Sequence, residues 1–192
     1  MEVGDGSLSD DDTVAISVNA AAGGTGAFQE DGGTVVMESE NYDDNAARSD
    51  DSGEAWSKAT SISGYVGEGY MIAPGSGAED WVDAAELSYE IDFTNAGTYY
   101  TWMRRWATSS ADNSAWVGLD GTIVGDGVTD RFDNYNGYYD QWYWRKHNTE
   151  VYISSGSHEF NVRRREGGYK IDRIILTTDD QYTPSGTGPP ES

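Results

Sequence analysis

Two glutamates placed two residues apart are the first feature of this 192-residue chain that could do chemistry. Glu38 and Glu40 follow the apolar residues 35–37 in the stretch VVMESENYDD. Side chains two apart on a strand point to the same face, so these carboxylates would repel each other unless a cation or a basic residue lay between them. The spacing therefore favours either a metal site or neutralisation by an arginine such as Arg48 or Arg173.

A second candidate is the aromatic segment RFDNYNGYYDQWYWRKH, residues 131–147. Flat rings among Gly, Asn and Asp suit sugars, because sugar CH faces stack on rings and sugar hydroxyls bond to planar polar groups. On a strand, Trp142 and Trp144 would share one face while Tyr143 points to the other. Trp142, Trp144 and Tyr139 are therefore candidate ligand-binding residues, and burial in a core is the alternative for each ring.

Basic residues are concentrated near these rings. Ten of the twelve Lys and Arg residues lie between Arg104 and Arg173, and Trp102, Arg104 and Trp106 would share one face of the strand GTYYTWMRRW. A guanidinium group is planar and binds carboxylate or sulfate through two hydrogen bonds. This segment predicts an acidic group on the ligand, unless the arginines only balance acidic residues of the protein itself.

The composition narrows the possible functions. The formal net charge is −22, with 34 acidic and 12 basic residues and no cysteine. Such acidity argues against binding to nucleic acid or to an anionic membrane, and no segment approaches the roughly 20 apolar residues of a membrane span. The acidic surface fits either an adaptation to salty water or several calcium sites.

Short alternating segments dominate the chain. The segment ELSYEIDF would place Leu87, Tyr89, Ile91 and Phe93 on one face, and similar segments follow between Gly, Asn and Asp residues. No stretch keeps a helical period of 3.6 residues over a dozen positions. The pattern predicts an all-β fold, namely a two-sheet β-sandwich of the jelly-roll type.

The two ends differ from the middle in composition. Residues 1–27 are interpreted as the end strand of an upstream immunoglobulin-like or cadherin-like repeat followed by a small-residue linker, and residues 180–192, rich in Pro, Gly and Ser, as a second linker. Residues 28–179 would then form the β-sandwich domain.

Six sequence segments occur in a characteristic order between residues 35 and 177: VVMESENY, ISGYVGEGYMIAP, GTYYTWMRR, DNSAWVGLDG, QWYW and SSGSHEFNVRRREGGYKIDRIILT. Together they resemble the β-sandwich carbohydrate-binding modules of families 6 and 35. The resemblance implies a structural Ca²⁺ ion held by Glu38, Glu40 and Asp172, and calcium indeed prefers such oxygen ligands. It also implies that Trp142 stacks on a sugar ring.

The resemblance adds a second group of candidate ligand-binding residues. Lys170 stands where those modules often carry an Asn that bonds sugar hydroxyls, so a positive charge replaces a neutral group. Arg165 and Glu166 lie nearby in the sequence, and Asp112 and Asn113 occupy a loop before a strand. Asx residues are also common turn formers, so a structural role is the alternative for the last two.

These features predict a non-catalytic carbohydrate-binding module that tethers an attached glycoside hydrolase or polysaccharide lyase to a polysaccharide. The protein is expected to be bacterial, secreted or at the cell surface, and monomeric. The ligand would be an acidic or algal polymer of the agarose or alginate type in a marine setting. The alternatives are a structural or adhesive calcium-binding domain, a small lyase using His147 with Tyr139, and a glycosidase.

Overall fold

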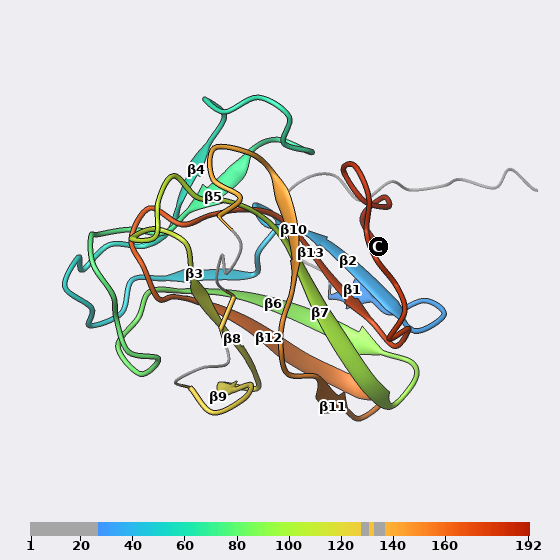
Figure 1. The fold of residues 1–192 in the computed structure, drawn as a ribbon. Coiled ribbons are helices and arrows are strands. Elements are labelled where there is room, and N and C mark those ends of the chain that lie inside the picture. Colours follow the sequence, from blue (N-terminus) through green and yellow to red (C-terminus); the bar gives the residue numbers. More distant parts are fainter. Residues whose placement is uncertain (1–26, 128–130, 133–136) are drawn as a thin grey trace, which may run out of the picture.

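The computed structural model describes residues 27–127, 131–132 and 137–192. The interpretation of residues 1–26 and part of the aromatic segment lie outside these described residues. The described chain consists of two β-sheets and contains no helix, and hence no helix that could cross a membrane (Figure 1). The predicted all-β, two-sheet sandwich is therefore confirmed.

The first sheet has the strand order β1-β6-β12-β8-β9, with β3 also paired to β6. Its strands are β1 (Phe28–Gln29), β3 (Asp44–Ala46), β6 (Glu86–Phe93), β8 (Ala115–Leu119), β9 (Thr122–Ile123) and β12 (Gly156–Arg164). The four residues predicted to share a face of β6, from Leu87 to Phe93, are all buried in the main core. Alternation of apolar and polar residues thus identified this strand correctly.

The second sheet has the order β10-β7-β13-β5-β4, with β11 also paired to β7 and β2 to β13. Its strands are β2 (Thr34–Glu38), β4 (Ser57–Ala59), β5 (Tyr70–Ile72), β7 (Gly97–Trp106), β10 (Tyr143–Lys146), β11 (Val151–Ile153) and β13 (Lys170–Thr177). The first and last long strands of this sheet therefore lie side by side and antiparallel.

A β-bulge interrupts the pairing of β13 with β7. Ile171 pairs with Arg105 and Arg173 with Arg104, so Asp172 is the extra residue. Because a bulge changes which face the following side chains occupy, both Ile171 and Ile174 reach the core between the sheets. The bulge also leaves the Asp172 carboxylate buried, where its charge needs partners.

The C-terminal segment after β13 returns along the free edge of β2 (Figure 1). The Ser192 N–H donates to the Val36 carbonyl at 3.0 Å, and the Val36 N–H donates to Ser192 Oγ at 2.9 Å. The Glu38 N–H donates to the Glu191 carboxylate at 2.8 Å. Residues 180–192 thus cover this strand edge, and their role as a linker to a neighbouring domain stays a prediction.

Candidate functional site

The two strands that carry the candidate metal ligands meet, as the resemblance implied. Glu38 at the end of β2 lies opposite Arg173 of β13, and the Ser39 N–H donates to the Asp172 carbonyl at 2.9 Å. Glu40 follows directly in the turn after β2. The backbones of Glu38, Glu40 and Asp172 therefore lie close together, where the end of β2 meets β13.

The carboxylates of Glu38 and Glu40 converge above Gly67. A Cβ atom at Gly67 would overlap both carboxylates, so only glycine leaves room for them. One oxygen of Glu40 accepts the N–H groups of Glu68 and Gly69 at 2.7 and 3.1 Å, whereas Oε2 is buried with no hydrogen-bond partner. Burial, with a contribution from the charge of Glu38, raises the pKa of Glu40 to about 7.

Asp172 does not join this pair. Its Oδ1 accepts the Val66 N–H at 2.8 Å, and its Oδ2 lies 2.5 Å from Nη1 of Arg104. Burial raises the pKa of Asp172, and the pairing with Arg104 opposes that effect. Within the described ranges, no three His, Asp or Glu side chains are close enough to hold a metal together.

Arginine neutralisation, the alternative reading of the Glu pair, is present at one of its members. Nη2 of Arg173 lies 2.5 Å from Oε1 of Glu38. The unpartnered Oε2 of Glu40 and the close approach of the two carboxylates over Gly67 nevertheless suit a divalent cation. Glu38 and Glu40 therefore fit a calcium ion, but the three-residue ligand set with Asp172 is not brought together.

The candidate sugar-binding rings lie on the outer face of the second sheet. Trp142, just before β10, lies edge-on to Trp106 at 5.5 Å and to Tyr70 at 5.3 Å between ring centres. The Arg104 guanidinium lies 5.2 Å from the centre of the Trp142 ring. We call Tyr70, Arg104, Trp106 and Trp142 the aromatic corner, and Trp106 and Trp142 are its half-buried members.

The loop 61–69, which was not among the predicted binding residues, fixes the aromatic corner. The Trp142 indole N–H donates to the Ser63 carbonyl at 3.0 Å, and Gly64 allows the close approach of that ring. Tyr65 of the same loop lies 6.0 Å from Tyr70 between ring centres. The two tyrosines in the sequence GYVGEGY were the available signal, because large rings beside glycines often line a binding surface.

Trp144 has a different environment from Trp142. Only 9% of its surface is exposed, and it packs with Val36, Ile175 and Tyr182 in a second apolar cluster. Its indole N–H donates to the Gly186 carbonyl at 3.1 Å. The C-terminal segment therefore covers Trp144, which favours the core alternative for this ring.

Trp102 lies with the Trp144 cluster, and Tyr139 lies in the loop before Trp142. Trp102 packs against the Trp144 cluster, and its indole nitrogen is buried with no hydrogen-bond partner. Tyr139 is half-buried in the loop before Trp142, where its N–H donates to the Gly137 carbonyl. Of the predicted rings on β7 and β10, namely Trp102, Trp106 and Trp144, it is Trp106 that contacts Trp142.

Asp112 and Lys170 are engaged within the protein. The Asp112 carboxylate accepts hydrogen bonds from the backbone and side chains of Thr108 and Ser109. Burial opposes ionisation here, but these hydrogen bonds outweigh it and lower the pKa of Asp112. Lys170 Nζ donates to the Gly168 carbonyl at 2.6 Å and lies 3.8 Å from Asp112. The turn-forming alternative for Asp112 is thereby favoured.

Glu166 organises the neighbouring loop. It accepts hydrogen bonds from the Asn113 N–H at 2.8 Å, from Ser114 Oγ at 2.7 Å and from Arg165 at 2.6 Å. The Arg165 guanidinium also lies 5.6 Å from the Trp116 ring centre. Asn113, Arg165 and Glu166 are therefore brought together, but Arg165 and Glu166 bond to each other and to neighbouring residues of the protein.

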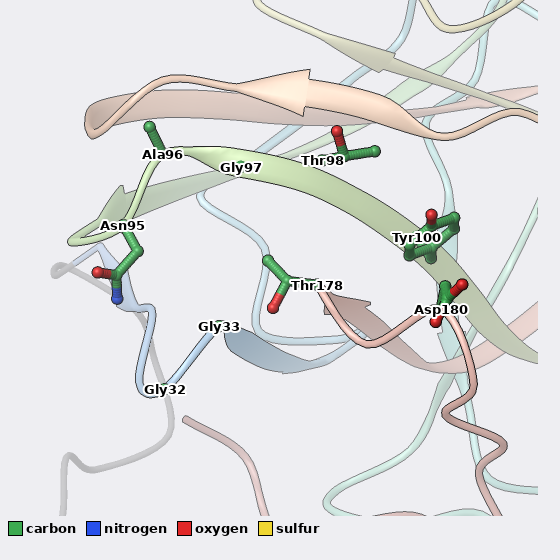
Figure 2. Close-up of a pocket in the computed structure, with 9 residues that line it drawn as sticks. All are labelled: Gly32, Gly33, Asn95, Ala96, Gly97, Thr98, Tyr100, Thr178 and Asp180. Carbon is green, nitrogen blue, oxygen red and sulfur yellow. The ribbon is translucent and has the colours of Figure 1, made fainter.

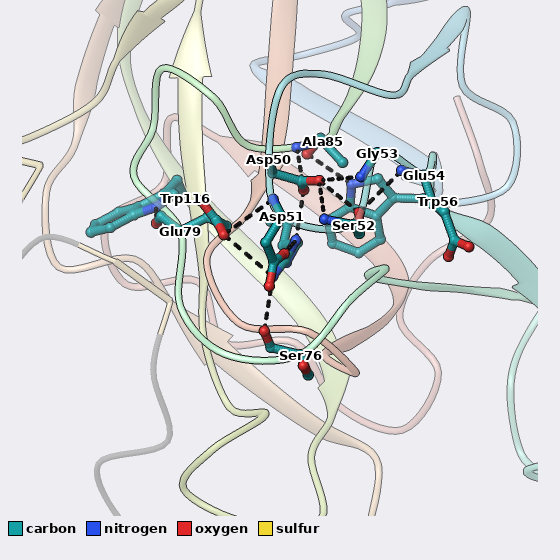
Figure 3. Close-up of polar contacts among 11 residues, drawn as sticks. Asp50, Asp51, Ser52, Gly53, Glu54, Trp56, Ser76, Glu79, Ala85 and Trp116 are labelled. Carbon is teal, nitrogen blue, oxygen red and sulfur yellow. Dashed lines mark hydrogen bonds and ion pairs between the residues drawn. The ribbon is translucent and has the colours of Figure 1, made fainter.

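Two further arginines of the basic segment, Arg163 and Arg164, also have acidic partners. Arg163 pairs with Glu86, and Arg164 lies 2.7 Å from Asp50 and 2.6 Å from Asp51. Asp50 additionally accepts the N–H groups of Ser52, Gly53 and Ala85, which close the loop 50–53 on itself and fasten it to the start of β6 (Figure 3). For these arginines, the ion pairs favour the alternative that they balance acidic residues of the protein itself.

Both histidines have structural surroundings. His147 is buried, its Nδ1 lies 2.8 Å from the Thr149 carbonyl, and its ring packs on Phe132. His158 bonds to Ser154 and to Asp120, which also accepts the Glu159 N–H. Neither arrangement exposes a histidine base beside the aromatic corner.

A family model described as "Glycosyl hydrolase family 115 C-terminal domain" matches residues 27–191. An uncharacterized protein of Formosa agariphila, P23, is 34% identical over 118 residues. That alignment covers 55% of this chain and 28% of the relative, so the chain spans less than a third of that protein's length.

Similar solved structures share the fold. A family 35 carbohydrate-binding module from Clostridium thermocellum has a TM-score of 0.55 and 14% identity, covering 76% of this chain and 98% of that one. A β-(1,4)-mannanase of Podospora anserina with a family 35 module has a TM-score of 0.55 and 20% identity, covering 79% and 29%. At these identities, the similarity to family 35 modules is confirmed at the level of the fold.

Proposed function

Because the chain belongs to the family of glycosyl hydrolase family 115 C-terminal domains, we propose that it binds carbohydrate and holds its hydrolase on a polysaccharide. A C-terminal domain of this kind is an accessory part of the hydrolase and is itself non-catalytic. Its partners would then be the other domains of the same chain and a polymeric glycan, in a secreted or cell-surface setting.

The aromatic corner is the observation that carries this proposal. Trp142 is held by its hydrogen bond to Ser63, by the edges of Tyr70 and Trp106, and by Arg104. A ring fixed before binding loses little conformational entropy when a sugar stacks on it. The half-buried indoles of Trp106 and Trp142 supply an apolar surface on which a sugar ring can stack.

A neutral glycan suits this site better than the acidic polymer expected from the basic segment. Arg104 is paired with Asp172, and Lys170 lies 3.8 Å from Asp112. A second anion would have to displace a carboxylate that is already in place, which costs the energy of the existing pair. Hydroxyl groups can bond to these side chains while the ion pairs stay intact.

Calcium belongs to the same proposal. Glu38 and Glu40 would hold the ion, with backbone carbonyls and water completing six to eight oxygen ligands. The ion would neutralise two carboxylates that repel each other and would fasten the loop around Gly67 to the end of β2. The unpartnered Oε2 of Glu40 supports this assignment.

Affinity gel electrophoresis with the whole domain tests the carbohydrate proposal. Neutral xylan, mannan and laminarin and acidic alginate would each be cast in gels at low and high salt with calcium present. Salt-insensitive retardation on a neutral polymer is expected. Salt-sensitive retardation on alginate would restore the acidic ligand, and no retardation on any polymer would favour the structural or adhesive domain.

A further inference from the structure

A pocket of about 560 Å³ lies at the other end of β7 from the aromatic corner (Figure 2). It is lined by the turns 32–33 and 95–97 and by Thr98, Tyr100, Thr178 and Asp180. Tyr100 and Trp106 are six residues apart on β7, which corresponds to about 20 Å along a strand. The pocket is therefore separate from the aromatic corner, and its volume is within the usual range for ligand sites.

A buried carboxylate holds the pocket in shape. Glu30 accepts hydrogen bonds from the N–H of Gly33, from the N–H of Asn95 at 2.8 Å and from the Asn95 side chain at 3.1 Å. Burial disfavours the charged form, but these hydrogen bonds outweigh it and lower the pKa of Glu30. Glu30 thus ties the two turns that form one wall of the pocket.

The opposite wall is tied to the same turn. The Thr178 N–H donates to the Gly33 carbonyl at 2.9 Å, and Gly33 has a φ of +84°. A Cβ atom at Gly33 would overlap the Thr178 side chain, so glycine is required for both the backbone conformation and the close approach. These contacts make the pocket pre-formed, and a pre-formed site loses little free energy in ordering itself around a ligand.

The groups that face this pocket are mostly uncharged and polar. Thr98 and Thr178 provide hydroxyls, Asn95 provides its side-chain carbonyl while Glu30 holds its NH2 group, and Tyr100 provides an aromatic wall (Figure 2). The Lys146 ammonium lies 4.2 Å from the centre of the Tyr100 ring, so an adjacent positive charge partly offsets the Asp180 carboxylate. A ring surrounded by hydroxyls and one carboxylate matches a ligand that has many hydroxyl groups.

Other ligand classes fit the pocket less well. The Asp180 carboxylate would repel an anion, and a divalent cation needs more oxygen ligands than this single free carboxylate and two hydroxyls offer. An apolar ligand would bury the threonine hydroxyls without hydrogen bonds. On the premise that the domain binds carbohydrate, we propose that this pocket is a second binding site for one neutral sugar unit of the polysaccharide.

Two sites on one domain would have a measurable consequence. A polymer that engages both the aromatic corner and the pocket gains affinity, because the second binding step is intramolecular. A short oligosaccharide would instead occupy the two sites independently. The prediction is therefore two distinct groups of backbone amides that shift on titration with an oligosaccharide.

The test is an ¹⁵N–¹H NMR titration of the whole chain with xylotriose, mannotriose and laminaritriose in turn. At least one probe is expected to shift amides around Gly97 and Thr178, and separately amides around Trp142. Thr98→Trp fills the pocket and should weaken binding there at least tenfold, with binding at Trp142 unchanged. Thr122→Trp is the matched control, since Thr122 is an exposed strand threonine of the other sheet.

The outcomes separate the two sites. Shifts confined to the Trp142 group, or a pocket group that Thr98→Trp leaves unaltered, would overturn the second site and leave the proposed function standing. Shifts confined to the pocket group would support the second site and would show that the aromatic corner does not bind the sugar. No shifts with any probe would overturn both. If Thr98→Trp fails to fold, Thr178→Val removes one hydroxyl and should weaken binding at the pocket several-fold.

Discussion

Nη1 of Arg104 lies 2.5 Å from Oδ2 of Asp172, although the two residues are 68 positions apart and both are buried. The same guanidinium donates to the Gly64 carbonyl at 2.9 Å and lies over the Trp142 ring. Arg104 thus connects the bulge in β13, the loop 61–69 and the Trp142 ring. The stability of the domain and the shape of its candidate site therefore depend on the same side chain.

Arg104→Ala should lower the free energy of unfolding by about 3–5 kcal/mol, because it leaves the buried Asp172 carboxylate without its cation. Urea denaturation followed by tryptophan fluorescence measures this change. Lys58→Ala is the control: its pair with Glu68 is exposed and should contribute no more than about 1 kcal/mol. Equal effects of the two substitutions would show that the Arg104–Asp172 pair does not stabilise the fold.

The pair of Glu38 and Glu40 predicts a pH-dependent stability. Without metal, Glu40 keeps its proton up to a pKa of about 7 in the folded state, whereas the unfolded chain releases it near 4.5. The folded state then binds more protons between these values, so the free energy of unfolding falls as pH rises from 4.5 to 7. Thermal unfolding in EDTA across this range measures the fall, and Glu40→Gln should reduce it.

Calcium should act in the opposite direction at the same site. It requires ionised carboxylates, so adding it should raise Tm more above pH 7 than near pH 5. Removing it with EDTA at pH 7.5 should lower Tm by several degrees in the unaltered protein and by much less in Glu40→Gln. An identical melting curve with calcium and with EDTA would rule out the calcium site.

The sequence allowed the prediction of those parts of the fold that depend on local alternation. The inward face of β6 and the shared face of Trp102, Arg104 and Trp106 both follow from the two-residue period of a strand. The bulge at Asp172 was not predictable in this way, because it arises from the pairing of two distant strands. Residues 180–192 read as a linker by composition, yet their backbone carbonyls accept hydrogen bonds from Trp144 and Arg173. Any backbone has such carbonyls, so composition gives no signal of this contact.

The sequence indicated which residue types make up the candidate site, but it indicated less well what each residue does there. The sequence placed Trp142 and Trp144 on one face but could not tell which of them the C-terminal segment covers, since that segment lies some forty residues further on. Likewise, the sequence predicted that Glu38 and Glu40 need a cation or a basic partner, and the resemblance added Asp172 to them. Whether a guanidinium or a metal supplies the charge depends on long-range packing, here of Arg173 and Arg104.

The contact between the C-terminal segment and Trp144 can be tested with two glycines. Gly186 and Gly188 both have positive φ, so alanine at either position carries a similar backbone cost of about 1–2 kcal/mol. At Gly188 the added Cβ would also lie 2.8 Å from the Trp144 ring, whereas nothing lies within 4 Å at Gly186. Gly188→Ala should therefore be less stable than Gly186→Ala by about 1–3 kcal/mol. Equal stabilities in urea denaturation would mean that the segment does not pack on Trp144.

Trp142 and Trp144 should differ in what their loss affects. Trp142→Ala is expected to weaken sugar binding by about 1–3 kcal/mol, if stacking on a sugar is comparable to stacking on a nucleic-acid base. That corresponds to roughly a 5- to 150-fold increase in Kd, measured by titration calorimetry with the polysaccharide retained in the gel screen. Trp144→Ala should instead lower the free energy of unfolding by about 3–5 kcal/mol, because it empties a buried space under the C-terminal segment. Below its melting temperature, that variant should bind sugar with nearly unchanged affinity. Unchanged binding by Trp142→Ala, with lost binding by folded Trp144→Ala, would move the site from the aromatic corner to the face that the C-terminal segment covers.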